Sequence, residues 1–235
     1  MWETARVQTI GLVGGMSWES SAVYYRDLNV GIQERLGGLS SPRLVLSTVD
    51  FAELTDLEET ERWDQIGQLL ASAAQGVERA GADFLMLCTT TFHKVADEVE
   101  AAVSIPLLRL GDVVAEAVVA AGITKVGLIG TKVAMSETFF TDRLARQGLE
   151  VVVPDSSHFD FLNSAIYEEL VHGVVVPRTR AKVIEIINEL WDAGAEGVLL
   201  GCTELELLIK QADVEIPVFP CTTLHVQAAL DRALA

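Results

Sequence analysis

The sequence is short of basic residues. Lysine and arginine together number 17 against 34 aspartates and glutamates, which leaves a formal net charge of −17 over 235 residues. Nucleic acids and anionic membranes are polyanions, so this balance works against unassisted binding to either of them. We therefore expect neither a nucleic-acid partner nor a membrane partner.

Cysteine and long apolar segments are also scarce. The three cysteines form no C-x-x-C pair, which leaves no recognisable zinc site and no disulfide framework. No stretch reaches the roughly 18 apolar residues that a membrane helix needs. The first residues, Met1–Thr4, lack the layout of a signal peptide. With 50% hydrophobic residues, the chain is predicted to be a compact cytoplasmic protein without a metal.

Two signatures of nucleotide binding are absent as well. Gly11, Gly14 and Gly15 end a short apolar run, but they do not fit the G-x-G-x-x-G spacing. No stretch matches the phosphate-binding pattern G-x-x-x-x-G-K-[ST]. Because the glycine spacing is what lets the backbone approach the phosphates, we expect no nucleotide cofactor.

What the chain does contain is an internal repeat. Segments 80–90 (AGADFLMLCTT) and 193–203 (AGAEGVLLGCT) each run from Ala-Gly-Ala through one acid into a short apolar run that stops at small polar residues. These runs are too short for helices and are typical of buried parallel strands. The gapless alignment sets Cys202 against Thr89. Since ligands bind at the carboxyl ends of parallel strands, we expect one site between two similar lobes, faced by Cys202 and Thr89.

Strands and helices alternate along the whole chain, which predicts an α/β fold with largely parallel sheets. An acid-rich stretch, Glu53–Glu61, is interpreted as a solvated loop. We expect a first lobe at 1–112, with the C-terminal helix 222–235 packed back on it, and a second lobe at 113–221. The expected strands are 7–16, 43–49, the apolar run within 80–90, 105–109, 125–131, 151–153, 197–201 and 216–219. The expected helices are 17–36, 63–79, 92–103, 112–121, 136–147, 159–172, 179–193 and 224–234.

Two strand ends that each present one acid–base group suit proton transfer at carbon. A carbon acid held between them can lose a proton from one face and regain one on the other, which inverts its configuration. Cys202 directly precedes a predicted helix, whose N–H groups would lower the pKa of the thiol. The hydroxyl of Thr89 is a far weaker acid and would need a neighbouring base. The flanking threonines are suitable donors to a substrate carboxylate.

Four motifs of the chain resemble the aspartate/glutamate racemase family. They are Gly14-Gly15-Met16-Ser17, the segment 89–93, Gly130-Thr131 and Gly201-Cys202-Thr203-Glu204. The resemblance covers nearly the whole chain, and stretches 14–20, 37–39 and 93–97 are most similar to the broad-specificity amino-acid racemase branch. It implies two pseudosymmetric Rossmann-like lobes, each with a largely parallel sheet flanked by helices, and an enzyme that uses no cofactor, pyridoxal phosphate included.

The first-lobe signature of that family is Cys-Asn-Thr-x-His, which stands here as Thr89-Thr90-Thr91-Phe92-His93. Threonine therefore replaces both the usual cysteine and the usual asparagine, and the broad-specificity branch is similar in carrying a Thr/Cys pair. The resemblance implies catalysis by Cys202 and Thr89 on opposite faces of the substrate. It gives substrate-binding roles to Met16, Thr90, Thr91, Thr131, Thr203 and Arg62, and supporting roles to His93 and Glu204.

Some of these residues have simpler interpretations. His93 can equally cap or pack at the start of a helix. Cys88 should point to the strand face opposite Thr89 and lie in the core, and Cys221 is also interpreted as structural.

The resemblance implies that the acid-rich region holds a substrate's distal carboxylate with a base, and Arg62 is the only base there. Acidic amino acids are therefore the expected substrates.

The predicted function is an amino-acid racemase that works as a homodimer on a small-molecule amino acid. Two alternatives stay open. One is a related decarboxylase or isomerase in which Cys202 acts alone, and release of carbon dioxide would identify it. The other is a small-acid binding protein that has lost activity, which would show ligand stabilisation without proton exchange at Cα.

Overall fold

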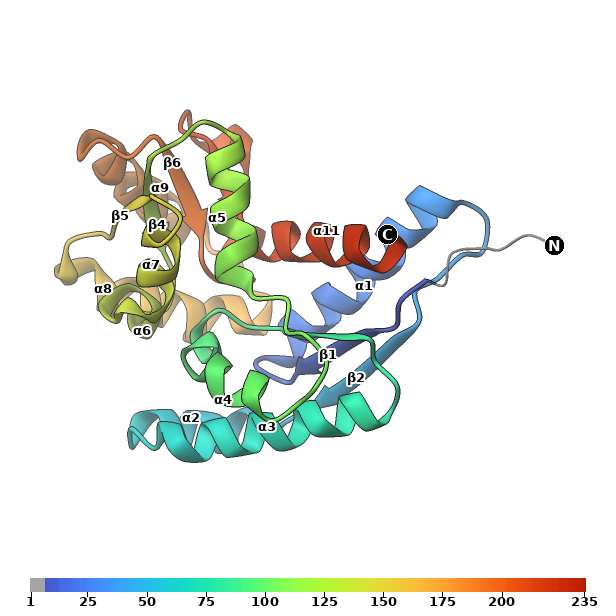
Figure 1. Ribbon diagram of the computed structural model, residues 1–235. Helices are drawn as coiled ribbons and strands as arrows, with labels where there is room; N and C mark the ends of the chain where they lie inside the picture. The colour runs from blue at the N-terminus through green and yellow to red at the C-terminus, as the bar shows by residue number, and fades with distance from the viewer. Residues whose placement is uncertain (1–6) are drawn as a thin grey trace. The chain divides into compact units, whose positions relative to one another are not determined.

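The computed structural model describes residues 7–235 (Figure 1). Residues 1–6, which include the stretch considered above for a signal peptide, lie outside the described residues. The chain divides into two compact units. Unit 1 comprises the residues up to Arg109 together with His225–Ala235, and unit 2 comprises Leu110–Leu224. Among residues 7–235, none of the helices combines the length and the apolar character that crossing a bilayer requires.

Each unit is built on one parallel sheet. The strand order is β2-β1-β3 in unit 1 and β5-β4-β6-β7 in unit 2, and every paired neighbour runs parallel. This confirms the predicted α/β fold with parallel sheets. The strands are β1 (Ile10–Gly14), β2 (Leu44–Thr48), β3 (Phe84–Leu87), β4 (Lys125–Ile129), β5 (Glu150–Val152), β6 (Gly197–Leu200) and β7 (Val218–Pro220).

Helices cover both faces of the sheet in unit 1. They are α1 (Trp18–Leu36), α2 (Phe51–Glu59), α3 (Trp63–Arg79), α4 (Ala96–Ala101) and, from His225 onward, α11 (Cys221–Leu234), with a 3₁₀ turn at Thr91–Val95. Helices α1 and α11 lie on one face, and α2, α3 and α4 lie on the other (Figure 1). Side chains alternate between the two faces along β1. Leu12 therefore packs in the core beneath α1 and α11, and Val13 packs in the core beneath α2, α3 and α4.

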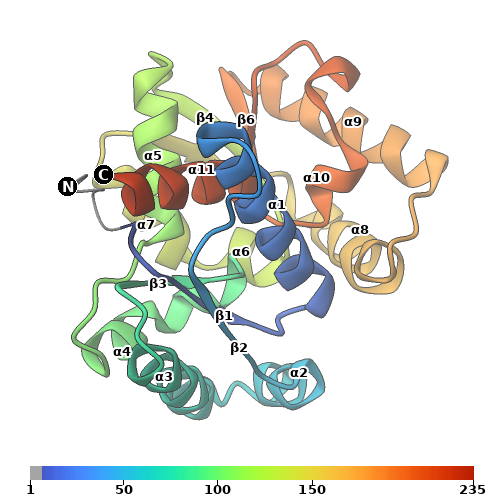
Figure 2. The same cartoon turned by 90° about the vertical axis from the view of Figure 1, so that its right-hand side faces the viewer.

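Unit 2 has the same layered construction. Its helices are α5 (Leu110–Ala120), α6 (Lys132–Ser136), α7 (Thr138–Ala145), α8 (Phe159–Ser164), α9 (Pro177–Asp192) and α10 (Leu205–Leu208), with a π-helical turn at Ala165–Glu169 and 3₁₀ turns at Ser156–His158, Leu170–His172 and Gln211–Asp213. Helices α5 and α7 pack on one face of the sheet, and α8, α9 and α10 pack on the other (Figure 2). Strand β6 is buried along its whole length, as a central parallel strand should be.

Several expectations about individual elements are wrong. The stretch 53–61 forms most of helix α2 rather than a loop, because Leu54 and Leu57 share one helix face and pack into the core. Residues 105–109 form no full strand, and only Leu107 makes a parallel bridge, with Leu85. The helix expected at 136–147 is α7 and starts at Thr138, because Ser136 is the last residue of α6 and the backbone is extended at Glu137. The helices expected at 92–103 and 159–172 are divided into shorter α, 3₁₀ and π segments.

Candidate active site

In unit 1 the candidate residues follow β1 and β3. The two strands are in register up to Val13 and Leu87, and the N–H of Cys88 donates to the carbonyl of Val13 at 2.9 Å, so both strands end at the same edge. Gly15 turns the chain after β1 with φ of 93°, and a Cβ there would lie 2.2 Å from a backbone oxygen. Only glycine fits such a position. Met16 follows it and is buried.

Thr89, Thr90 and Thr91 follow β3, and all three are buried. The carbonyl of Thr89 lies 2.7 Å from Nδ1 of His93, and the hydroxyl oxygen of Thr89 is 3.5 Å from the N–H of Phe92. Because a carbonyl can only accept, His93 carries a proton on Nδ1 and donates it. His93 therefore fastens the turn that holds Thr89, in addition to packing there.

The neighbouring Cys88 belongs to the core. Its side chain is fully buried in the cluster that contains Ile10 and Met86, and burial raises the pKa of its thiol. The prediction that Cys88 lies in the core is confirmed. A thiol in this environment stays protonated and has no access to a polar ligand.

A second histidine lies beside His93 and has no signal in the sequence. The ring of His225, on α11, stands edge-on to the ring of His93 with centroids 6.1 Å apart. Nε2 of His225 is 2.8 Å from the carbonyl of Leu108, and Nδ1 is 3.0 Å from the hydroxyl of Tyr24. The carbonyl fixes the proton on Nε2, so Nδ1 accepts from Tyr24. Burial lowers the pKa of His225 to about 4, so the ring is neutral at neutral pH.

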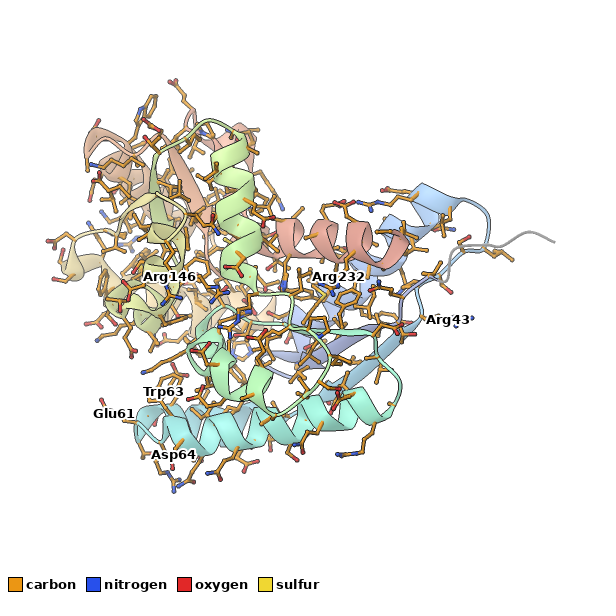
Figure 3. All side chains as sticks on the ribbon, viewed as in Figure 1. Arg43, Glu61, Trp63, Asp64, Arg146 and Arg232 are labelled. Carbon is orange, nitrogen blue, oxygen red and sulfur yellow. The ribbon has the colours of Figure 1, made fainter. Side chains whose placement is uncertain are left out.

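Arg62 lies at the junction of α2 and α3 and is exposed. Its Nε donates to the hydroxyl of Thr60 at 3.2 Å. The adjacent Trp63, labelled in Figure 3, packs against Phe92 with ring centroids 6.2 Å apart. Nζ of Lys94 lies 3.8 Å from the centre of the Trp63 ring, a cation–π contact. The start of α3 is thus packed on the turn that follows Thr89, and Lys94 is a second base there that the sequence patterns do not single out.

In unit 2 the candidate cysteine follows β6. The N–H of Gly201 donates to the carbonyl of Ile129 at 2.8 Å, which holds the end of β6 against β4. Cys202 is partly exposed, and its Sγ lies 2.9 Å from Oε2 of Glu204. Glu204 is only 4% exposed. The thiol donates its proton to a buried carboxylate, so a proton acceptor is in place beside the sulfur.

The pKa of Cys202 is raised well above the usual value for a thiol, so the expectation of a lowered pKa is wrong. Burial is the largest cause, and the charge and hydrogen bond of Glu204 add to it. The backbone N–H groups of Glu204 and Leu205 do lower the pKa, as expected of a helix start, but α10 has only four residues and its effect is outweighed. The resting residue is a thiol.

The threonines of unit 2 lie around the same sheet edge. Thr131 follows β4 and caps α6 by accepting from the N–H of Ala134 at 3.2 Å. The hydroxyl oxygen of Thr203 lies 2.9 Å from that of Thr222, at the start of α11. The sequence patterns did not identify Thr222, although Pro220-Cys221-Thr222-Thr223 resembles the polar strand ends of the repeat.

Glu206 lies behind these hydroxyls. Its carboxylate accepts from the N–H of Thr222 at 2.6 Å and from the hydroxyl of Thr223 at 2.8 Å. Burial raises the pKa of Glu206, while these donors oppose the rise. Cys221 is buried in the core of unit 2, where burial and the charge of Glu206 raise the pKa of its thiol. Its interpretation as a structural residue agrees with this burial.

The described residues offer no metal site, since no group of three or more His, Cys, Asp or Glu side chains among them could hold an ion. The polar atoms at the two strand edges are hydroxyls, one thiol, carboxylates and backbone N–H groups. This set can move protons and bind carboxylate or ammonium groups.

Comparison with known proteins identifies the family. A sequence model of the family described as Asp/Glu/Hydantoin racemase matches residues 13–229. The crystal structure of a candidate Asp/Glu racemase from Yersinia pestis is 41% identical, with a TM-score of 0.91, and the match covers 97% of this chain and 100% of that one. PH1733, an aspartate racemase homologue from Pyrococcus horikoshii OT3, is 34% identical, with a TM-score of 0.85 and the same coverage. The broad specificity amino-acid racemase RacX from Bacillus subtilis (strain 168) is 20% identical over 96% of this chain and 98% of its own length.

The chain therefore belongs to the Asp/Glu/hydantoin racemase family. It is an isomerase of the amino-acid racemase type, and the family expected from the four motifs is confirmed.

Proposed function

We propose that this racemase inverts the Cα of its amino-acid substrate by moving protons through Cys202 on one face and Thr89 on the other. The observation that carries the proposal is the 2.9 Å contact between Sγ of Cys202 and the buried carboxylate of Glu204. A protonated thiol is a poor base, and an adjacent carboxylate supplies the acceptor that it needs. Of Cys202 and Thr89, Cys202 is therefore the group with a proton acceptor beside it.

The proton balance of one turnover follows from these partners. The thiol proton of Cys202 passes to Glu204, and the resulting thiolate removes the Cα proton, so the Cα–H bond breaks as an S–H bond forms. The hydroxyl of Thr89 gives its proton to the opposite face of the carbanion. Glu204 is then protonated and Thr89 is an alkoxide, and one proton moved through water from the carboxyl to the alkoxide restores both. The reverse inversion uses the same steps in the opposite order.

The remaining roles are assigned by position. Met16, Thr90, Thr91, Thr131 and Thr203 are buried at the strand ends and are proposed to bind the main-chain part of the substrate. His93 is proposed to hold Thr89 in place by donating a hydrogen bond to the carbonyl of Thr89. Arg62 is proposed to bind a distal carboxylate, which makes aspartate and glutamate the leading substrates.

The proposed assembly is a homodimer, the commonest symmetric state of small enzymes. The proposed compartment is the cytoplasm. Its support is that all three cysteines, Cys88, Cys202 and Cys221, are free thiols, which persist in a reducing environment.

The test is proton exchange at Cα. The protein is incubated in D₂O with each L- and D-amino acid, and loss of the Cα proton signal is followed by NMR together with optical inversion. Cys202→Ala should abolish both, whereas the matched variant Cys88→Ala should keep most of the activity of the folded protein. Release of carbon dioxide without inversion would identify a decarboxylase. Thermal stabilisation by an amino acid without exchange would identify a binding protein, and either result would refute the proposal.

A further inference from the structure

Asn163 ties helix α8 to the start of helix α6. Its side-chain oxygen Oδ1 accepts a hydrogen bond from the backbone N–H of Lys132 at 3.0 Å. Lys132 is the first residue of α6, and it comes three positions after Ile129, the last residue of β4. Helices α6 and α8 lie side by side (Figure 1). Asn163 is therefore held beside the carboxyl edge of the sheet of unit 2.

The same edge carries the candidate cysteine. Strands β4 and β6 end together, and a Cβ on Gly130 would lie 3.3 Å from the carbonyl oxygen of Gly201. Cys202 follows Gly201 and packs against the apolar cluster that contains Leu162, the residue before Asn163. All of these residues belong to unit 2, so their arrangement is complete within one unit.

The hydrogen bond to Lys132 fixes the direction of the Asn163 amide. A backbone N–H can only donate, so the atom that faces Lys132 is Oδ1, and Nδ2 is the outer atom. Among residues 7–235, Nδ2 has no hydrogen-bond partner, and it is not one of the buried atoms that lack a partner. Asn163 therefore presents two N–H donors to solvent beside the strand edge.

A pair of free amide donors suits a carboxylate, which can only accept. Helix α8 also continues directly into the π-helical turn Ala165–Glu169, and turns of this kind are rare and frequent at functional sites. We propose that Nδ2 of Asn163 donates a hydrogen bond to a carboxylate of the substrate. The inference rests on the proposed function for the identity of the ligand as an amino acid. It adds an amide donor to the hydroxyls and backbone N–H groups of the strand ends.

Two substitutions at Asn163 separate a binding role from a structural one. Asn163→Asp keeps an oxygen that can accept from the N–H of Lys132, so the tie between α6 and α8 is retained. It also replaces the two donors with an oxygen that repels a carboxylate. Asn163→Ala removes the tie and the donors together, without adding a charge.

Asp160 provides the control, because it joins the same two helices. Its carboxylate lies 2.7 Å from Nζ of Lys132, and both side chains are exposed. Asp160→Asn removes the charge from this second tie between α6 and α8 and leaves Asn163 in place. It should leave the affinity for amino acids unchanged.

Calorimetry measures the dissociation constants of alanine and aspartate for the parent protein and the three variants. Asn163→Ala should weaken binding about tenfold, the size of one hydrogen bond to a charged group. Asn163→Asp should weaken it further, because repulsion is added to the lost bond. Equal losses for the two ligands assign the contact to the α-carboxylate, and a loss confined to aspartate assigns it to the side-chain carboxylate.

A purely structural Asn163 gives the opposite order, in which Asn163→Asp binds as the parent does and Asn163→Ala binds worse. That order would overturn the inference, and so would parent-like binding by Asn163→Ala or an equal loss in Asp160→Asn. A calorimetric dissociation constant does not depend on the fraction of molecules that fold, which changes only the stoichiometry. Failure of the proposed function shows elsewhere, as absence of Cα exchange in the parent protein, and it leaves these affinities measurable.

Discussion

The hydroxyl of Tyr24 lies 3.0 Å from Nδ1 of His225, which joins the first helix of unit 1 to the last helix of the chain. With Leu108 bound to Nε2, both ring nitrogens of His225 have partners in a fully buried setting. A charged ring would have to donate from Nδ1 to a hydroxyl oxygen without access to water. The neutral ring is therefore the form that the fold accommodates.

The first prediction concerns acid stability. The pKa of His225 is about 4 in the folded protein, against 6.5 for an ordinary histidine. Between these values the unfolded chain binds more protons, so the free energy of unfolding should rise with pH, by about 3 kcal/mol across the window. His225→Gln keeps a donor for Leu108 but does not titrate, so it should flatten this dependence. Urea unfolding at several pH values between about 4 and 7 measures it.

The exposed His172 provides the control. His172→Gln should leave the pH dependence as it is in the parent protein. If His225→Gln and the parent show the same slope, the ring of His225 is not the group that controls acid stability.

The second prediction separates the reactivity of Cys202 from its catalytic use. Glu204→Gln removes a charge that raises the pKa of the thiol, so alkylation of Cys202 by iodoacetamide at mildly alkaline pH should become faster. Racemisation should nevertheless slow, by about 100-fold or more, because the proton acceptor is lost. Mass spectrometry of the alkylated peptide and the Cα exchange assay give the two rates.

Glu215→Gln, a change at an exposed acid of the same unit, should alter neither rate. Slower alkylation in Glu204→Gln would contradict the contribution of Glu204 to the raised pKa of Cys202. Unchanged racemisation would remove it from the proton path.

The third prediction concerns Thr89. Thr89→Cys places a stronger acid at the first-unit strand end and should hold or raise the turnover number, whereas Thr89→Val should remove exchange on that face. In the parent protein kcat can differ between the two directions, but kcat/KM must be equal, because free enantiomers have the same energy in water. Polarimetry from pure L and pure D substrate checks both points. A folded but inactive Thr89→Cys protein would contradict the two-base mechanism.

The fourth prediction concerns the substrate side chain. Arg62→Ala should lower kcat/KM for aspartate and glutamate by several-fold more than for alanine, since an exposed charge contributes on the order of 1 kcal/mol. Lys94→Ala is the informative companion, because Lys94 is the other base beside Trp63. A selective loss in Lys94→Ala but not in Arg62→Ala would move the side-chain role to Lys94. Better turnover of neutral amino acids by the parent protein would refute the acidic assignment.

Much of the scaffold was predictable because its signals are local. The apolar runs that end at Cys88 and Gly201 are bounded by glycine and small polar residues, and they became β3 and β6 within a residue. The errors came where a local signal was ambiguous. The acids of α2 concealed a short helix in which Leu54 and Leu57 are the buried residues. Pro106, which has no N–H, interrupted an apolar run that looked like a strand.

The candidate site was less predictable because its chemistry depends on contacts through space. The helix start that lowers the pKa of Cys202 could be inferred from sequence order, but the burial that reverses the shift could not. Glu204, two positions after Cys202, was identified as a supporting residue, although its hydrogen bond to the thiol was not. Nothing in the sequence brings Tyr24 to His225, or Thr222 to Thr203, since each pair meets only after the sheets form.

Helix α11 affects the order in which the two units obtain all of their core residues during synthesis. Its residues Val226, Ala229, Leu230 and Ala233 fill the core of unit 1 against β1 and β3. Unit 1 is therefore the first to be synthesised and the last to obtain all of its core, whereas the residues of unit 2, which end at Leu224, are complete earlier. A chain that ends at Leu224 would keep all residues of unit 2 but would leave the apolar sheet face of unit 1 covered by α1 alone. Such exposed apolar surface is what makes incomplete chains prone to aggregate.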